Sequence, residues 1–112
     1  MQKIEAIVRE DSFNPIKKAL EENGFISMTV SDVIGRGRQK GIFLKWRAGE
    51  HRIDFLPKKK IELVLEDKNL QVALDIICKI GKTGAIGDGK IFVMPVAEVI
   101  RIRTGDKGVE AI

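Results

Sequence analysis

The sequence repeats its own pattern at a spacing of 57 residues within a chain of 112. Shifting the chain by this spacing places residues 3–5 on residues 60–62, which read Lys-Ile-Glu in both copies, and it places Gly24 on Gly81. Each copy opens with a segment typical of a strand, and an apolar stretch typical of a helix follows and ends at the glycine. The repeat therefore predicts two strand–helix–strand units.

Local signals place the elements of these units. The first helix is expected to have Asn14 as its N-cap, Pro15 at its first position and Gly24 as its stop. Residues 35–54 show no regular pattern and predict a long loop, of a kind that is usually functional or mobile. Strands are expected over residues 3–9, 25–34, 60–65 and 91–94, and the second helix over residues 69–80.

Two such units close most naturally as an α+β, ferredoxin-like (split βαβ) sandwich, in which both helices cover one face of a four-stranded antiparallel sheet. The predicted strands are apolar on both faces, with Val8 and Leu63 on one and Ile7 and Val64 on the other. The uncovered face would be best satisfied by packing against other subunits. The chain has the length of one domain, so residues 1–112 are expected to form a single unit.

Composition restricts the class of protein. No apolar run approaches the roughly 20 residues of a membrane span, and the N-terminus lacks the apolar stretch of a secretion signal. Cys78 is the only cysteine, which excludes an internal disulfide and fits a reducing cytosol. Its isoleucine neighbours predict that its thiol is buried and inert.

Positive charge is concentrated in one segment. Residues 36–60 carry nine lysines and arginines against two carboxylates, in a chain whose formal net charge is +4. This segment indicates a surface that attracts anions, although solvated loops are also often charged. Residues 35–41, Gly-Arg-Gly-Arg-Gln-Lys-Gly, could face a phosphate. They do not form a dinucleotide fingerprint, because the third glycine comes one residue late and no helix follows.

A second glycine-rich stretch spans residues 83–92, Thr-Gly-Ala-Ile-Gly-Asp-Gly-Lys-Ile-Phe. Its three glycines allow backbone N–H groups to converge on an anion, and Lys90 adds a positive charge. An ordinary glycine-rich turn explains the pattern equally well. Arg101 and Arg103 would lie on one face of an extended chain, either as a fork for a polyphosphate or as protective charges on a strand edge.

The sequence offers little for enzymatic chemistry. His51 is the only histidine, and one histidine with one cysteine makes neither a catalytic triad nor a metal site. A non-enzymatic protein is therefore expected. The alternative function is that of an RNA-binding ferredoxin-like module. Such a module needs exposed aromatic residues on its strands, and this chain has no tyrosine.

Four separated segments together resemble the PII signal-transduction proteins of nitrogen metabolism over essentially the whole chain. These are residues 35–41, 55–58, 83–93 and 101–105. The resemblance implies a cytoplasmic homotrimer that binds ATP or ADP between subunits, together with Mg²⁺ and 2-oxoglutarate. It also implies that the ligands set the conformation of a long protruding loop, about residues 37–55, which contacts target proteins.

The resemblance carries roles to particular residues. The nucleotide site would comprise Ile7, Gly35, Gly37, Arg38, Gln39, Val64, Gly87, Asp88, Gly89 and Lys90, with Thr29, Arg101 and Arg103 coming from the adjacent subunit. Gln39 would ligate the metal. The 2-oxoglutarate site would comprise Arg9, Gln39, Lys40, Gly41, Lys58 and Gly87.

The loop tip would contact partners through Trp46, Arg47, Glu50 and His51. In many bacterial members a tyrosine that receives a nucleotidyl group stands where this chain has His51. The resemblance implies one of two kinds of partner. The first is an ammonium transporter, whose mouth Arg47 would enter, and the second is an enzyme of nitrogen metabolism, a class to which nitrogenase belongs. No nucleic acid and no membrane insertion are expected, but the protein would associate reversibly with the membrane through such a transporter.

Overall fold

The computed structural model describes residues 1–38, 42–46 and 49–112, with residues 42–46 and 49–53 described through their backbone. The α-helices are α1 (Glu10–Glu22) and α2 (Leu70–Gly81), and short 3₁₀ turns are η1 (Asp67–Asn69) and η2 (Gly108–Ala111). The strands are β1 (Gln2–Arg9), β2 (Thr29–Gly35), β3 (Ile42–Trp46), β4 (Gly49–Ile53), β5 (Leu56–Leu65) and β6 (Gly89–Pro95).

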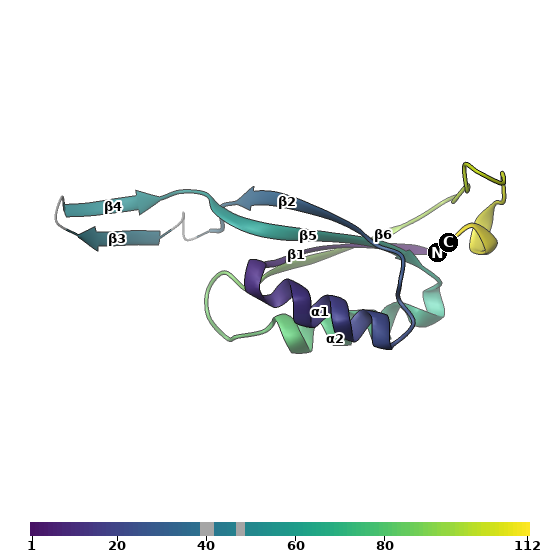
Figure 1. Cartoon of the computed structure of the whole chain (residues 1–112), viewed down its shortest axis with the longest axis horizontal. Coiled ribbons are helices and arrows are strands. Elements are labelled where there is room, and N and C mark those ends of the chain that lie inside the picture. Colours follow the sequence, from purple (N-terminus) through teal and green to yellow (C-terminus); the bar gives the residue numbers. More distant parts are fainter. Residues whose placement is uncertain (39–41, 47–48) are drawn as a thin grey trace.

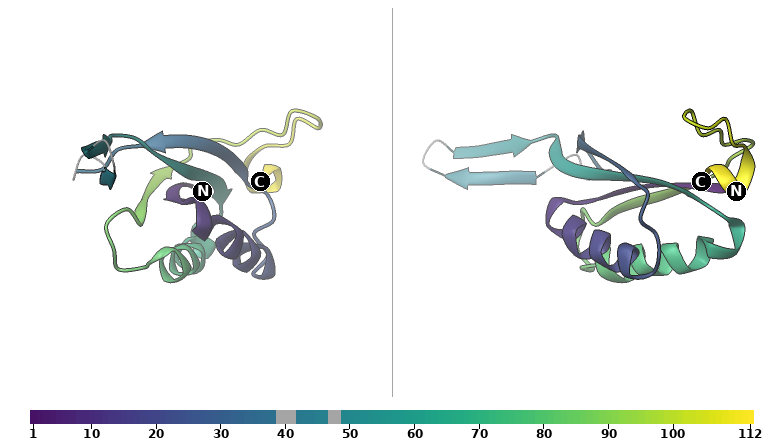
Figure 2. Two further views of the ribbon diagram at one scale, coloured as in Figure 1. Left: turned by 60° about the vertical axis from the view of Figure 1, so that its left-hand side comes forward. Right: turned by 45° about the vertical axis from the view of Figure 1, so that its right-hand side comes forward.

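The main sheet has the strand order β2-β5-β1-β6, and every neighbouring pair is antiparallel. Both α-helices lie on one face of this sheet (Figure 1), and the turned views show the same two layers (Figure 2). The predicted four-stranded antiparallel sheet with two helices on one face is confirmed. It is compatible with the ferredoxin-like fold that the repeat predicts.

The core lies between the sheet and the helices. Alternate residues of β1 and β5 are buried, as expected for strands with one face against helices. From the helices, buried residues recur four positions apart, so each helix presents one apolar stripe. The buried apolar residues are Ile4, Ala6, Val8, Ile61, Leu63 and Leu65 of the strands and Ile16, Leu20, Ala73 and Ile77 of the helices.

The outer face of the sheet is more charged than the apolar strand pattern indicates. Lys3 Nζ lies 3.1 Å from the Glu5 carboxylate and 3.5 Å from that of Glu62, and Lys60 Nζ lies 3.4 Å from Glu62. Ile7 is half-buried on the same face. This face therefore combines apolar side chains with ion pairs, of which Lys3–Glu62 joins β1 to β5 and the other two each lie within one strand.

The first helix begins earlier than expected. It starts at Glu10 with Pro15 inside it, so the prediction of an N-cap at Asn14 is wrong. Glu10 and Asp11 place negative charge at the positive end of the helix dipole, and burial of Ile16 offsets the hydrogen bond that Pro15 lacks. The predicted stop is confirmed, because Gly24 has a φ of +88° and follows the last turn.

The expectation of no regular structure over residues 35–54 is wrong as well. β3 and β4 pair antiparallel, from Ile42 opposite Ile53 to Trp46 opposite Gly49. The β3 sequence, Ile-Phe-Leu-Lys-Trp, is rich in the β-branched and aromatic residues that favour strands. The glycines and charges around it concealed this signal. In Figure 1 the hairpin lies beyond the end of the main sheet.

The second helix contradicts one further expectation, because Cys78 is exposed and not buried. The buried positions of α2 are Ala73, Ile77 and Gly81, which recur every four residues. Cys78 follows one of them and turns about 100° away from that stripe. Within the described ranges, no helix combines the length and apolar character that crossing a membrane requires.

Glycine at position 89 is required by the approach of two strands. A Cβ on Gly89 would lie 1.7 Å from the carbonyl oxygen of Ile7, and its φ is +103°. Gly24 also has a positive φ, but a Cβ there would meet nothing within 4 Å. We expect Gly24→Ala to lower the free energy of unfolding by about 1–2 kcal/mol and Gly89→Ala by more than about 3 kcal/mol.

Urea unfolding followed by circular dichroism measures both changes, with Gly24→Ala as the matched control for the positive φ alone. Equal losses in the two variants would contradict the close approach of Gly89 to Ile7.

Candidate functional site

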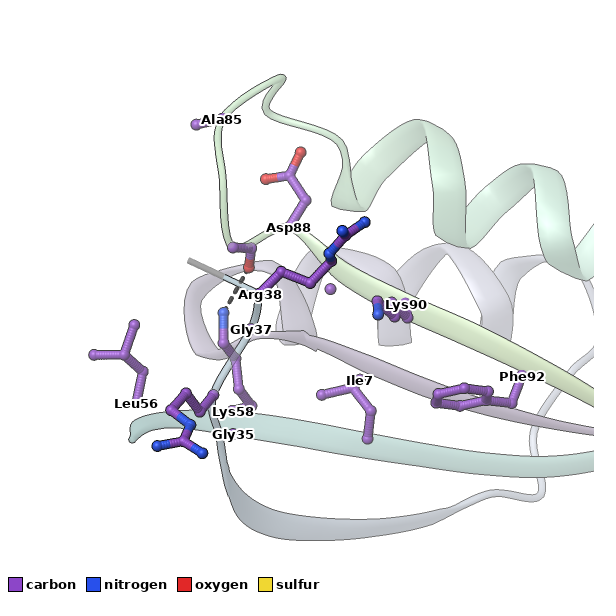
Figure 3. Close-up of a pocket in the computed structure, with 13 residues that line it drawn as sticks. Ile7, Gly35, Gly37, Arg38, Leu56, Lys58, Ala85, Asp88, Lys90 and Phe92 are labelled. Atoms are coloured by element: carbon purple, nitrogen blue, oxygen red, sulfur yellow. Dashed lines mark hydrogen bonds between the residues drawn. The ribbon is translucent and has the colours of Figure 1, made fainter. Parts of the chain in front are cut away.

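A cleft of about 430 Å³ lies where the ends of β2 and β5 face the glycine-rich loop that precedes β6. Figure 3 shows Lys58 and Arg38 approaching this loop, while Ile7 and Phe92 lie along the floor. The cleft opens on the outer face of the sheet, because Ile7, Lys58 and Lys90 alternate with buried or helix-facing neighbours. Its lining comprises Ile7, Gly35, Arg36, Gly37, Arg38, Leu56, Lys58, Ala85, Gly87, Asp88, Gly89, Lys90 and Phe92.

The lining has two chemical parts. Arg36, Arg38, Lys58 and Lys90 supply positive charge, and Asp88 is the one carboxylate among the lining residues that the structure describes. Ile7, Leu56 and Phe92 supply apolar surface. A cleft of this kind suits a ligand with a flat apolar part and an anionic part.

The glycine-rich loop has the backbone that an anion cradle needs. Gly84, Gly87 and Gly89 have φ values of 87°, 101° and 103°, a region that residues with side chains rarely adopt. The Asp88 carboxylate holds the turn together, since it accepts hydrogen bonds from the backbone N–H groups of Thr83 (2.8 Å) and Gly84 (3.0 Å). These hydrogen bonds within the protein give the loop a defined shape.

Two cations tie this loop to the sheet. Arg9, the last residue of β1, donates from Nε to Asp88 Oδ1 (3.0 Å) and from Nη2 to the carbonyl oxygen of Ile86 (2.6 Å). Lys58 of β5 donates from Nζ to the carbonyl oxygen of Gly87 (2.5 Å), the contact that is dashed in Figure 3. The ends of two central strands therefore position the loop.

These contacts change the pKa values of two groups in the cleft. The pKa of the Asp88 carboxyl is held well below its usual range, first by the hydrogen bond from the Thr83 hydroxyl and then by Arg9. The pKa of Lys58 is lowered from 10.5 by burial and by the positive charge of Arg9. Asp88 therefore stays ionised at neutral pH.

The structure brings most of the sequence-predicted nucleotide residues to this one cleft. They are Ile7, Gly35, Gly37, Arg38, Gly87, Asp88, Gly89 and Lys90. Of the residues predicted for 2-oxoglutarate, Lys58 and Gly87 line the cleft, and Arg9 contacts its loop. Gln39, Lys40, Gly41 and Arg47 lie outside the described residues, as do the side chains of Trp46, Glu50 and His51.

Four predicted residues lie elsewhere on this chain. Thr29 stands opposite Glu62 on the outer face of the sheet. Val64 lines a different hollow with Val109 and Ile112, so it does not border the cleft within one chain. Arg101 and Arg103 belong to the C-terminal segment.

That segment corrects another prediction, because residues 99–104 do not form an extended strand. The Gly105 N–H donates to the Arg101 carbonyl oxygen (2.7 Å), which closes a turn, and Gly105 has a φ of +74°. The Arg101 guanidinium pairs with Asp106 (3.1 Å) and donates to the Glu110 carbonyl (2.9 Å). Arg101 and Arg103 therefore do not project side by side from a strand.

Sequence reasoning assigned no individual role to four lining residues, although each lies in a stretch that it singled out: Arg36, Leu56, Ala85 and Phe92. Alternation supplied the signal for two of them, because Leu56 and Phe92 lie two positions from Lys58 and Lys90 and share their face. Arg36 lies between two predicted glycines. Its guanidinium carbon also sits 5.3 Å from the centre of the Phe55 ring, a cation–π contact at the base of the β3–β4 hairpin.

The chain is similar to known proteins over its whole length. The family model described as "Nitrogen regulatory protein P-II" matches residues 1–106. A protein of that name from Azospirillum brasilense is 51% identical over 112 residues, which is all of both chains. The protein of that name from Microchaete diplosiphon is 47% identical over all of both chains. "Nitrogen regulatory protein P-II 2" from Methanothermobacter thermautotrophicus is 48% identical over the whole of this chain and 97% of its own.

The lowered pKa of Lys58 provides a test of the site's electrostatics. Since the Arg9 charge lowers this pKa, Arg9→Gln should raise it toward 10.5. Asp11 raises the pKa of Lys58, so Asp11→Asn should shift it the opposite way and serves as the control. Titration of the lysine Cε signals by NMR measures both. An unchanged or lower Lys58 pKa in Arg9→Gln would show that the two cations do not interact.

Proposed function

This chain belongs to the nitrogen regulatory P-II family, and we propose that it senses ATP or ADP together with 2-oxoglutarate and passes their state to target proteins. Members of this family are regulatory signal transducers, so the protein is a regulator and not an enzyme. Family membership gives no support to the alternative of an RNA-binding module.

The cleft beside the glycine-rich loop is the observation that carries the nucleotide proposal. An adenine ring fits the apolar floor of Ile7 and Phe92, and a polyphosphate fits the positive-φ glycines and the cations beside them. Gly87, Gly89 and Lys90 would cradle the phosphates. Gly35, Gly37, Arg38 and Gln39 would close the site from the side of the hairpin.

The proposed site needs a second subunit. Thr29, Arg101 and Arg103 lie away from their own cleft, so each would serve the cleft of a neighbour in a homotrimer, and Val64 would border the base only in that assembly. The side chain of Ile102, between the two arginines, is 98% exposed in one chain. Such exposure fits a segment that packs against another subunit.

The 2-oxoglutarate would bind beside the phosphates, where Arg9 and Lys58 supply charge. Gly87 and the backbone near Lys40 and Gly41 would complete this site. Within the described ranges there is no group of three or more histidine, cysteine or acidic residues that could hold a metal. Mg²⁺ would therefore be held mainly by the ligand phosphates, with Gln39 as its protein ligand.

Signalling would follow because the cleft is lined by residues from both ends of the segment that contains the β3–β4 hairpin. Gly37 and Arg38 lead into this segment, Leu56 and Lys58 follow it, and all four line the cleft. A ligand that contacts both ends would favour some conformations of a protruding loop over residues 37–55 and disfavour others. By linkage, it would change the affinity for any partner that requires a disfavoured conformation.

The proposed partner is an ammonium transporter or an enzyme of nitrogen metabolism, a class to which nitrogenase belongs. Trp46, Arg47, Glu50 and His51 would make the contacts, and Arg47 would enter the mouth of a transporter, where its five donors can meet polar groups. The protein would act in the cytoplasm and reach the membrane through this partner alone.

The shared site predicts cooperative binding. We expect wild-type protein to bind 2-oxoglutarate measurably in isothermal titration calorimetry only when ATP and Mg²⁺ are present, because the metal would bridge both ligands. Lys58→Gln should abolish 2-oxoglutarate binding, whereas ATP binding should weaken but stay measurable, because Lys58 also holds the Gly87 carbonyl of the cradle. Lys59→Gln is the matched control, because Lys59 pairs with Asp32 and not with the loop. Equal 2-oxoglutarate affinity with and without ATP would exclude the shared site.

The partner proposal predicts a dependence on one loop residue. In cells that contain an ammonium transporter, the protein should sediment with membranes in ADP and be released by ATP with 2-oxoglutarate. Arg47→Ala should abolish the membrane association and leave the calorimetric ATP affinity unchanged, whereas Arg52→Ala removes the same charge and should keep the association. Protein that stays in the supernatant under every condition would eliminate the transporter as partner.

A further inference from the structure

The Asp88 carboxylate is fully engaged within the protein. Its Oδ1 accepts from Arg9 Nε (3.0 Å) and from the Thr83 hydroxyl (2.5 Å), and its Oδ2 accepts from the N–H groups of Thr83 (2.8 Å) and Gly84 (3.0 Å). An ionised carboxylate offers about four acceptor positions, and four donors occupy them here. Asp88 therefore has no free acceptor position for a ligand donor.

A negative charge is also unsuited to direct contact with a polyphosphate. Two like charges repel, and the repulsion strengthens where water is partly excluded. Figure 3 shows the Asp88 carboxylate directed toward the glycine-rich loop and away from Ile7 and Phe92. The Arg9 guanidinium beside it compensates its charge. Asp88 lines the cleft, but its carboxylate accepts its hydrogen bonds from Arg9 and from residues of the glycine-rich loop.

Thr83 completes this arrangement from outside the cleft. Its hydroxyl donates to Asp88 and accepts from the Ala85 N–H (3.1 Å), so it connects the start of the loop to both its middle and its end. The hydrogen bonds between Thr83 and Asp88 join the two ends of residues 83–88. Asp88 itself stands between Gly87 and Gly89. The N–H groups proposed to hold phosphates thus belong to a segment that Thr83 and Asp88 shape.

We propose that Thr83 and Asp88 are positioning residues of the phosphate cradle, which act through the backbone of Gly87 and Gly89 and do not contact the nucleotide. The inference rests on the proposed nucleotide function and revises the direct role that the resemblance gave to Asp88. A loop that is already ordered does not lose conformational entropy when the ligand binds. Loss of the pair therefore weakens the binding of the phosphates and not of the nucleoside.

The test compares Thr83→Val, Thr83→Ser and Asp88→Asn with the wild type. Calorimetry measures ATP affinity, and NMR titration measures adenosine affinity. Thr83→Val removes the hydroxyl at nearly constant volume and lowers ATP affinity about tenfold or more, as for loss of a hydrogen bond to a charged group. Adenosine affinity changes less than twofold. Thr83→Ser restores the hydroxyl and ATP affinity, and Asp88→Asn, which removes the charge at constant shape, behaves like Thr83→Val.

Three outcomes are decisive. If the wild type binds ATP and Thr83→Val and Asp88→Asn bind it equally well, the inference is overturned and the proposed function stands. If adenosine and ATP affinities fall together, with a lower unfolding temperature, the pair only stabilises the fold and the inference is again overturned. If the wild type binds no nucleotide, the proposed function fails and the inference falls with it.

Discussion

The pairing of β1 with a strand on each side is the constraint on which the rest of the structure depends. Burial of Ile4, Ala6 and Val8 against the helices directs the alternate residues to the opposite face. Ile7 stands opposite Lys60 on one side and Lys90 on the other, so it forms the floor of the cleft. A shift of one residue in register would exchange the two faces and remove the cleft.

The same pairing brings the end of β1 and the start of β5 together at the site. Arg9 ends the first strand and stands opposite Lys58 of β5, and both side chains hold the glycine-rich loop. The core thus fixes the position of the cleft, while hydrogen bonds around Asp88 fix the shape of its rim. A ligand there would meet a preformed rim on one side and the hairpin segment on the other.

The repeat and the alternation of apolar residues were sufficient to predict the sheet and its two helices, because burial dominates both signals. Glycine spacing indicated a loop over residues 83–90, but it fitted an anion cradle and an ordinary turn equally well. Local sequence signals gave wrong predictions where tertiary contacts determine the structure. Burial of Ile16 keeps Pro15 inside a helix that was expected to begin there, and the turn at Gly105 folds a segment whose sequence is typical of a strand. Arg36 and Phe92 received no individual role from the sequence, since their place in the cleft depends on which strand ends meet.

We propose that the backbone of residues 87–90 forms the polyphosphate site of this regulator. Mapping the ¹H–¹⁵N chemical shifts of the wild-type protein during an ATP titration tests it most directly. We expect the largest shifts at the amides of Gly87, Gly89 and Lys90, together with those of Gly35 and Gly37. Shifts confined to the hollow beside Val64 and Val109, or no shifts at all, would contradict it.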